Sequence, residues 1–437
     1  MESLMSLQRS QSLNTALKIV TAAVFLSHLS SCADERPVIE PFLMEGQLEE
    51  GSRAVRQHLE RNPDDQSAKF TLGMAQFFQA LEGLGQDQYR YGLLAGRARA
   101  LPFMRLPIAE NEEPEQITYE KAREIIQSFV DRLQKAEQTL ASVASENVVV
   151  PLRLGQVRLD LNGDGETPNE ESIWHITQVL QNPRLSNENA QVRDFHIVFD
   201  SGDVPWLQGY CHALSAMGEI VLAHDWKDQF ERTAHLFYPK VKSPYFFLAE
   251  EGTGAFFSFG PQNALDVLAW IHTINYEVTE PDRMRKALLH LETMIQLSRV
   301  SWAFIDKEQD DNREWVPNAR QTSVMRGFNV TGSVVAGWKE FLDEMDLILK
   351  GRKLVPFWRG VRGGVSPFAT SVPINPTLGI NVRRVFTEPT RLDLALWIQG
   401  TAALPYLERG DITSPRKWNQ MIGQFRGQFF NFALWFN

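Results

Sequence analysis

Residues 160–171 are the segment whose residue types and spacing are best suited to chemistry, because they place oxygen-bearing groups at intervals along a short loop. A hard cation takes roughly six to eight oxygen ligands, and alternate residues of a tightly turning loop point toward one centre. Gly165 stands at the sharp turn, where a residue without a Cβ is favoured. We therefore expect one calcium ion here. Its predicted ligands are Asp160, Asn162, Asp164, Glu166 through its carbonyl, and Glu171.

This spacing resembles the calcium-binding loop of the EF-hand family, which carries the same residue types at the same loop positions. The resemblance covers residues 160–171 only. Thr167 stands where paired EF-hands have an aliphatic residue, and no second segment of the sequence matches the pattern. The resemblance implies a solitary loop that binds Ca²⁺. The alternative is an acidic turn that joins two elements without a metal.

The segments on either side of the loop predict a strand, then the loop, then a helix. Residues 148–159 alternate and are rich in β-branched types, which favours a strand. Residues 167–170 have the pattern of a capping box with Pro168 at the first helical position. An apolar stripe follows at Ile173, Trp174, Ile176, Val179 and Leu180.

Residues 1–31 have the character of a signal peptide. A weakly cationic start precedes the apolar stretch 19–26, which is too short to span a bilayer. Residues 29–32 (LSSC) resemble the bacterial lipobox. That resemblance implies cleavage before Cys32, a lipid on Cys32 and, with Ala33 next, an outer-membrane lipoprotein that faces the periplasm or the cell surface. Ordinary signal cleavage and an uncleaved anchor are the alternatives.

Composition and charge describe an ordinary globular protein. The chain has 437 residues, 43% of them hydrophobic, and a formal net charge of −10. An acidic exported protein is poorly suited to nucleic acid, whose phosphates it repels, so we expect no nucleic-acid partner. Basic residues in the C-terminal third are expected to be dispersed over surface loops; they are Arg352, Lys353, Arg359, Arg362, Arg383 and Arg384.

The chain has two cysteines, Cys32 and Cys211. A lipidated Cys32 cannot form a disulfide, so the core must be stable without crosslinks. Cys211 lies in an apolar helical pattern, which favours a buried, inert thiol over a nucleophile.

The sequence predicts a mainly α fold: a helical bundle or repeat-like helical architecture with a few short β-strands around the calcium loop. Residues 32–50 are expected to be a lipidated N-terminus and polar tether. In the helical region 51–146, residues 51–86 resemble one tetratricopeptide-type helix pair, which implies a protein partner. A helical hairpin packed on the rest is the alternative. Residues 147–437 form the main helical domain, with an irregular and functional connection at 352–390.

Individual elements follow from periodicity and end signals. Thr118 is a predicted cap for an amphipathic helix over 119–144, residues 195–199 a strand, and Asp203 the start of a long helix. Gly351 and Gly410 have the positions of glycines that follow helices. The aromatic C-terminal tail is expected to pack into the core. Further helices are predicted at 262–276, 282–300, 332–350, 391–409 and 415–436.

The function expected from these features is that of an exported cell-envelope lipoprotein with one structural calcium ion, which binds or scaffolds a partner protein and is held at the membrane by its lipid. The alternative is a cell-envelope hydrolase with a site near His212 and the 352–390 connection. The acidic segment 306–312 is either a further cation site or, more simply, a solvated loop. The polar residues considered for the hydrolase site are His212, Glu219, His224, Asp225, His290 and Glu292.

We predict that the mature protein begins at Cys32 and partitions with membranes, because an acyl chain adds apolar area that associates with the bilayer. Mass spectrometry of the N-terminal peptide checks this directly. The Cys32→Ser variant should release or stall the protein. An unmodified N-terminus at a residue other than Cys32, or a wild-type protein found soluble in the periplasm, would contradict the prediction of a lipoprotein.

Overall fold

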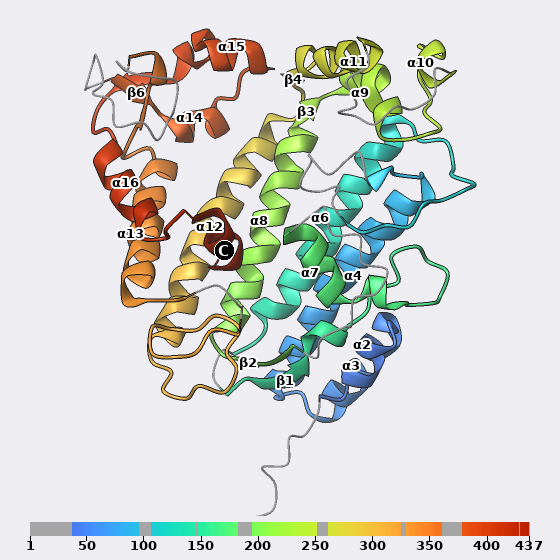
Figure 1. Cartoon of the computed structure of the whole chain (residues 1–437). Helices are drawn as coiled ribbons and strands as arrows, with labels where there is room; N and C mark the ends of the chain where they lie inside the picture. Colours follow the sequence, from blue (N-terminus) through green and yellow to red (C-terminus); the bar gives the residue numbers. More distant parts are fainter. Residues whose placement is uncertain are drawn as a thin grey trace, which may run out of the picture. The chain divides into compact units, whose positions relative to one another are not determined.

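The computed structural model describes residues 37–95, 106–144, 147–181, 195–250, 261–324, 329–360, 378–427 and 429–436. The predicted lipidation site at Cys32 lies outside them. From Val38 onward the chain forms one compact unit, built mainly of α-helices with a few short strands (Figure 1). The mainly α prediction is confirmed.

The elements alternate long helices with short irregular connections. The helices are α2 (Glu40–Met44), α3 (Leu48–Arg61), α4 (Gln66–Arg90), α6 (Tyr119–Ala141), α7 (Ile173–Gln181), α8 (Asp203–Ala223), α9 (Lys227–Thr233), α10 (Phe247–Glu250), α11 (Pro261–His272), α12 (Pro281–Ile305), α13 (Gly332–Leu349), α14 (Val382–Thr387), α15 (Leu394–Gln399), α16 (Pro415–Gly423) and α17 (Phe429–Phe436). The strands are β1 (Val149–Arg153), β2 (His196–Asp200), β3 (His224–Asp225), β4 (Asn275–Val278), β5 (Val355–Pro356), β6 (Leu378–Ile380), β7 (Leu392–Asp393) and β8 (Leu407–Arg409).

The strands of the described residues form three small antiparallel sheets. β1 pairs with β2, β4 lies between β3 and β7, and β6 lies between β5 and β8. Only the first sheet borders the predicted calcium loop, so the strands are not confined to that region as expected.

Helix α8 lies between α6 and α12 and packs along both (Figure 1). Small residues allow this approach: Ala216 and Ala223 are fully buried, and Gly218 faces Val130 of α6 so closely that a Cβ would lie 2.4 Å from Val130 Cγ2. Thr118 caps α6 by accepting a hydrogen bond from the Lys121 N–H, as predicted.

The prediction of a tether over residues 32–50 is wrong for its described part. Helix α2 and the start of α3 fall within it, and Ile39, Leu43 and Leu48 are buried in the core. The segment is polar in overall composition, but it contains three buried apolar residues: Ile39 just before α2, Leu43 within α2 and Leu48 at the start of α3. The compact fold therefore begins near Val38, not Gly51.

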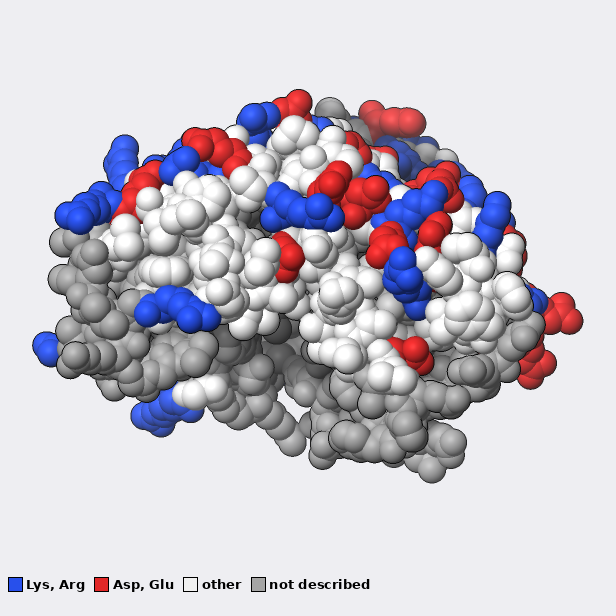
Figure 2. Space-filling view, turned by 90° about the horizontal axis from the view of Figure 1, so that it is seen from above, with Lys and Arg blue, Asp and Glu red and all other residues white. Residues whose placement is uncertain are grey.

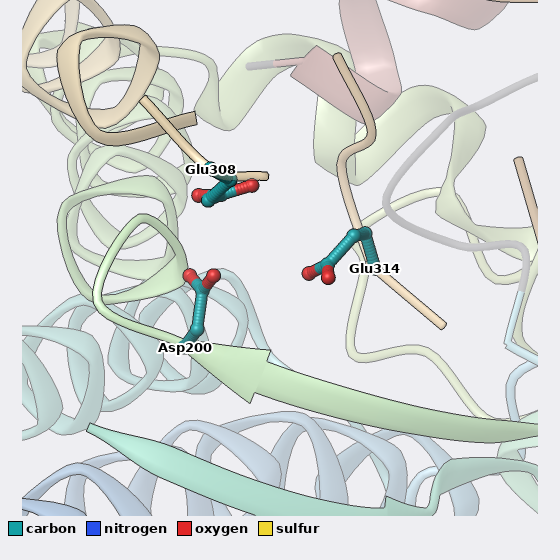
Figure 3. A group of neighbouring side chains, drawn as sticks. All are labelled: Asp200, Glu308 and Glu314. Carbon is teal, nitrogen blue, oxygen red and sulfur yellow. The ribbon is translucent and has the colours of Figure 1, made fainter. Parts of the chain in front are cut away.

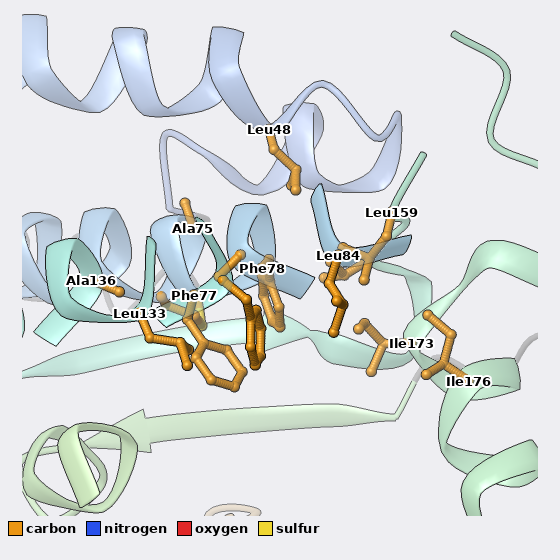
Figure 4. Packing of buried hydrophobic residues seen from close by; sticks show 14 of the residues in the cluster. Leu48, Ala75, Phe77, Phe78, Leu84, Leu133, Ala136, Leu159, Ile173 and Ile176 are labelled. Carbon is orange, nitrogen blue, oxygen red and sulfur yellow. The ribbon is translucent and has the colours of Figure 1, made fainter. Parts of the chain in front are cut away.

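Helices α3 and α4 form the predicted helix pair, a hairpin that packs on the rest of the protein. Its core continues without a break into α6 and the segments around the loop at 160–171, which contribute Leu159, Ile173 and Ile176 (Figure 4). The predicted division near residue 146 is therefore not a boundary between domains.

A second core cluster joins α8 and α12 to the C-terminal helices. Phe425, Phe432 and Phe436 are each at most 2% exposed, and the Phe436 ring lies 5.0 Å from the Trp302 ring and 5.7 Å from the Trp338 ring. The aromatic tail thus packs inward, as predicted. No helix in the described part of the chain is long and apolar enough to cross a membrane.

The connection at 352–390 is more ordered than predicted, where it is described. It contains β5, β6 and α14, while residues 361–377 lie outside the described residues. The helix predicted at 391–409 is also wrong: β7, α15, a 3₁₀ turn at Thr401–Tyr406 and β8 take its place. Gly400 adopts a φ of +103° and Pro405 follows, which together interrupt a continuous helix. Gly351 ends α13 with a φ of +68°, as predicted, whereas Gly410 follows a strand.

Basic side chains of the C-terminal third engage acidic partners within the fold. Lys353 bonds the fully buried Glu344 at 3.0 Å, and Arg383 bonds Glu292 at 2.7 Å. On the face of the molecule shown in Figure 2, basic and acidic side chains are interspersed, with uncharged areas between them.

We predict that Gly218→Ala destabilises the protein by about 1–3 kcal/mol, because its Cβ would overlap the stiff, buried Val130 side chain and push α8 from α6. Denaturant unfolding measures this. Gly423→Ala in α16 is the matched control, since its Cβ meets nothing within 4 Å; it should be neutral or stabilising by up to about 1 kcal/mol. Equal stability of the two variants would contradict the close packing of α8 and α6.

Candidate functional site

The predicted calcium loop folds around the Asp160 carboxylate. Its Oδ1 accepts a hydrogen bond from the Gly163 N–H at 2.7 Å, and its Oδ2 accepts one from the Gly165 N–H at 3.0 Å. Both glycines have positive φ, +76° and +81°. The prediction that Gly165 provides the sharp turn is thus confirmed, since such a backbone conformation is strained for other residues.

The next two predicted ligands also hold the turn. Asn162 Oδ1 accepts from the Asp164 N–H at 3.0 Å, and Asp164 Oδ1 accepts from the Glu166 N–H at 2.7 Å. These side-chain-to-backbone bonds keep the loop in a tight conformation without a regular element. The Glu166 side chain is exposed, so its predicted contribution through the main-chain carbonyl does not require the carboxylate.

The ends of the loop are joined by a short antiparallel bridge. The Leu159 N–H donates to the Glu171 carbonyl at 3.0 Å, and the Ile173 N–H donates to the Val157 carbonyl at 2.8 Å. Leu161 anchors the loop on α4, where a Cβ on Gly85 would lie 2.7 Å from its Cδ2.

The predicted capping box at 167–170 is wrong. Residues Asn169–Glu171 form a 3₁₀ turn, and α7 begins only at Ile173. Ser172 caps this helix, since its hydroxyl accepts from the His175 N–H at 3.2 Å. Thr167 instead donates its hydroxyl to the Glu45 carbonyl at 3.3 Å.

Glu171 is the buried end of the loop. It is 6% exposed; its Oε1 accepts from the Leu161 N–H at 3.0 Å, and its Oε2 is buried without a hydrogen-bond partner. Burial, followed by the negative charges of Asp160 and Asp164, raises the pKa of Glu171 to about 7. A buried carboxylate oxygen without a hydrogen-bond donor, such as Glu171 Oε2, is stabilised by a bound cation or by protonation.

Glu82 of α4 is a second acidic group beside the loop, which the sequence did not single out. Its Oε1 accepts from the Asp160 N–H at 3.0 Å. Burial raises its pKa to about 7, and the charges of Asp160 and Glu171 add to the shift. Because the folded-state pKa values of Glu82 and Glu171 exceed those of free carboxyls, both groups destabilise the fold increasingly as pH rises from about 4.5 to 7. A bound cation would offset that cost.

The carboxylates of Asp160, Asp164 and Glu171 do not converge within 4.8 Å of one another in the described structure. The predicted ligands lie on one hydrogen-bonded loop, but their carboxylates are not gathered around one point. Calcium binding at this loop stays a prediction.

His212 and His290 are the two candidate hydrolase residues that the fold brings together. Their Nδ1 atoms lie 2.7 Å apart, and His212 Nε2 lies 3.6 Å from Glu137 Oε1 of α6. Burial and the neighbouring His212 lower the pKa of His290. The bond from His212 lowers the pKa of Glu137.

The other candidate residues have separate partners. Glu219 pairs with Arg283 at 2.8 Å, and Glu292 pairs with Arg383. His224 Nδ1 donates to the Ile220 carbonyl at 2.7 Å. Asp225 accepts from the Tyr119 hydroxyl at 2.8 Å. Cys211 is 1% exposed, and burial raises the pKa of its thiol, which supports the prediction of an inert cysteine.

A cavity of about 440 Å³ lies among α4, α6, α8 and α9. Most of its wall is aliphatic or aromatic, and none of the described residues that line it is Asp, Glu, Lys or Arg. His224 supplies one polar group: burial lowers its pKa, and since its Nδ1 donates to a carbonyl, Nε2 is left as an acceptor. Sequence reasoning missed this cavity because its wall comes from segments far apart in the chain.

Comparisons with protein-family models, with curated proteins and with solved structures found no match to this chain.

We predict that the loop contributes one calcium ion to the binding stoichiometry. Asp160→Asn with Glu171→Gln should remove one bound ion per chain, because both negative charges are lost. Each amide side chain keeps one oxygen that can accept a backbone hydrogen bond, from Gly163 and from Leu161. Glu170→Gln, an exposed neighbour, is the matched control. Titration calorimetry counts the ions, and equal stoichiometry in the double variant and the control would leave the loop as an acidic turn.

The energetic effect should be modest. For a dissociation constant of roughly 0.1–1 mM, about 1 mM calcium stabilises the fold by on the order of 0.4–1.4 kcal/mol. The loop variant should lose this increment while staying folded without calcium, because Leu159, Leu161 and Ile173 anchor the flanks in the core.

Proposed function

We propose that this protein is an exported, lipid-anchored protein of the cell envelope that binds a small, largely apolar molecule in the cavity among α4, α6, α8 and α9, with calcium as a structural staple. The observation that carries the proposal is the cavity of about 440 Å³.

The size and the wall of the cavity support a ligand of this class. Protein interiors contain few voids larger than a water molecule, whereas sites for small molecules occupy roughly 300–1,000 Å³. Ala122, Ile125, Leu214, Ile220 and Val221 line the cavity and are only partly buried, so they offer apolar surface to an occupant. The uncharged wall disfavours a ligand whose charge would enter it.

The polar groups indicate where such a ligand would be oriented. His224 and Tyr276 both line the cavity, and the Tyr276 hydroxyl donates to Gln229 on α9. A ligand hydroxyl or amide could donate to His224 Nε2, while its apolar body lies against α6 and α8. We therefore propose an uncharged ligand with one polar group.

Two parts of this proposal, the lipid anchor and the bound calcium ion, are based mainly on sequence patterns. The lipobox-like residues 29–32 support attachment to the membrane, and the turned loop at 160–171, with an unsatisfied oxygen on Glu171, supports a cation. The hydrolase alternative has support only in the contact of His212 with His290, since its other candidate residues have separate partners.

We predict saturable one-to-one binding of the uncharged fluorophore N-phenyl-1-naphthylamine to the purified protein. Val221→Trp should weaken it by at least about tenfold, because the indole would fill space between α8 and α6. Val300→Trp is the matched control: the same exchange on an exposed position of α12, with unchanged affinity expected. Fluorescence titration measures both.

Competition then tests the ligand class. An uncharged fatty alcohol should displace the dye, and a short dicarboxylate should not. Absence of saturable dye binding, or equal affinity of the Val221→Trp and Val300→Trp variants, would overturn the proposed function.

A further inference from the structure

Three carboxylates from separate parts of the chain meet at the end of strand β2. Asp200 ends β2, while Glu308 and Glu314 lie in the connection after α12. Their side chains point into one shared space (Figure 3), and one ligand oxygen from each lies within 4.8 Å of the other two. A calcium ion at roughly 2.3–2.6 Å from each oxygen spans oxygen separations of up to about 5 Å. The spacing therefore suits one hard cation.

Glu314 gives an independent indication of a missing partner. Its side chain is 3% exposed, it points into the shared space, and its Oε1 is buried with no hydrogen-bond partner (Figure 3). A buried carboxylate oxygen without a donor is costly, and it is stabilised by a proton or by a cation.

Most of the other buried acidic residues in the described part of the chain have a basic partner, unlike the acids at the end of β2. In the described part of the chain, seven Asp or Glu residues are buried. Four of them have a Lys or Arg within 4.0 Å: Glu40, Glu219, Glu344 and Asp346. The remaining three are Glu171 in the predicted calcium loop, and Glu314 and Asp203 at this cluster.

Basic residues near the cluster do not compensate it. Among the described residues, neither Asp200 nor Glu308 has a Lys, Arg or His within salt-bridge distance, and the Arg320 guanidinium donates to the main-chain carbonyls of Asp306 and Glu308 instead. Burial, then the neighbouring negative charges, raises the pKa of Glu308 to about 8 and that of Glu314 to about 7. The pKa of the fully buried Asp203 is raised for the same two reasons.

Hydrogen bonds from neighbouring residues hold two of the three acids, Asp200 and Glu308, in place. The Gly202 N–H donates to Asp200 Oδ1 at 2.7 Å, and Gln321 Nε2 donates to Glu308 Oε2 at 3.2 Å. At Gly202 a Cβ would lie 3.2 Å from Glu308 Oε1 and 3.3 Å from Asp200 Oδ1, so the absence of a side chain there keeps the space open.

We propose that Asp200, Glu308 and Glu314 bind one hard divalent cation, calcium or magnesium, at a site distinct from the 160–171 loop. The ligand set contains only oxygen, which favours these ions over transition metals. The bound ion links the end of β2 and the start of α8 to the connection that follows α12. The acidic segment 306–312 thereby contributes a ligand, Glu308, to a site that it does not form alone.

The test uses a protein whose loop site has been disabled by Asp160→Asn and Glu171→Gln. Titration calorimetry with CaCl₂ and, separately, with MgCl₂ should still detect one ion per chain. Adding Glu308→Gln and Glu314→Gln should weaken this binding by at least about tenfold. Adding Asp311→Asn, an exposed carboxylate of the same connection, should leave it unchanged.

The neutralised variant is expected to fold, because it removes mutual repulsion, and in EDTA its melting temperature should equal or exceed that of its parent. Terbium provides a second measurement on the loop-disabled protein itself. Trp315 adjoins Glu314, so bound Tb³⁺ should show emission sensitised by tryptophan, and Trp315→Phe should reduce it. Binding of either calcium or magnesium that is lost with the two glutamates supports the site. Binding of neither ion, or equal binding in the neutralised variant, overturns it.

Discussion

A carboxylate that is removed from water needs a positive charge or a proton beside it, and this constraint explains much of the polar architecture of the protein. Glu344, with no exposed surface, lies between Lys353 and Lys417, which ties α13 to the segment before β5 and to α16. Glu40 likewise fixes α2 to β1 through Arg153 at 3.1 Å. Asp200, Glu308 and Glu314 lie together without such a partner among the described residues, and a cation is the compensation that we propose for them.

Helix α8 shows how the need to pair buried polar groups affects the central part of the fold, because it packs between α6 and α12. Its small residues allow α8 to pack closely against both α6 and α12. Nearly every polar side chain along α8 is therefore buried and needs a hydrogen-bond or ion-pair partner. Asp203 accepts from the Asp200 N–H at its first turn, Glu219 pairs with Arg283, and His224 donates to a carbonyl at its end. Because Glu219 and His224 have separate partners, they are poor candidates for one catalytic site. The same interactions keep the buried helix stable.

Some local features could be predicted from the sequence, whereas contacts between residues far apart in the chain could not. The turn at Gly165 and the cap at Thr118 depend on residues within a few positions, and the structure has both. Glu82 contacts the predicted calcium loop from 78 residues away, and no spacing rule connects it to Asp160. The helix predicted at 391–409 does not form, because Gly400 and Pro405 interrupt its apolar pattern.

The proposed cation site and the cavity are related through α8, although they share no residue. Asp203 begins this 21-residue helix and His224 directly follows it, so the two ends are about 30 Å apart at the usual rise per residue. Over that distance the charge of a bound ion is largely screened, and a direct electrostatic effect on the cavity is small. A rigid helix packed against α6 through Gly218 moves as a unit, however, and Gly218 also lines the cavity. Any effect of the proposed ion on the cavity would therefore have to pass through the position of α8 on α6.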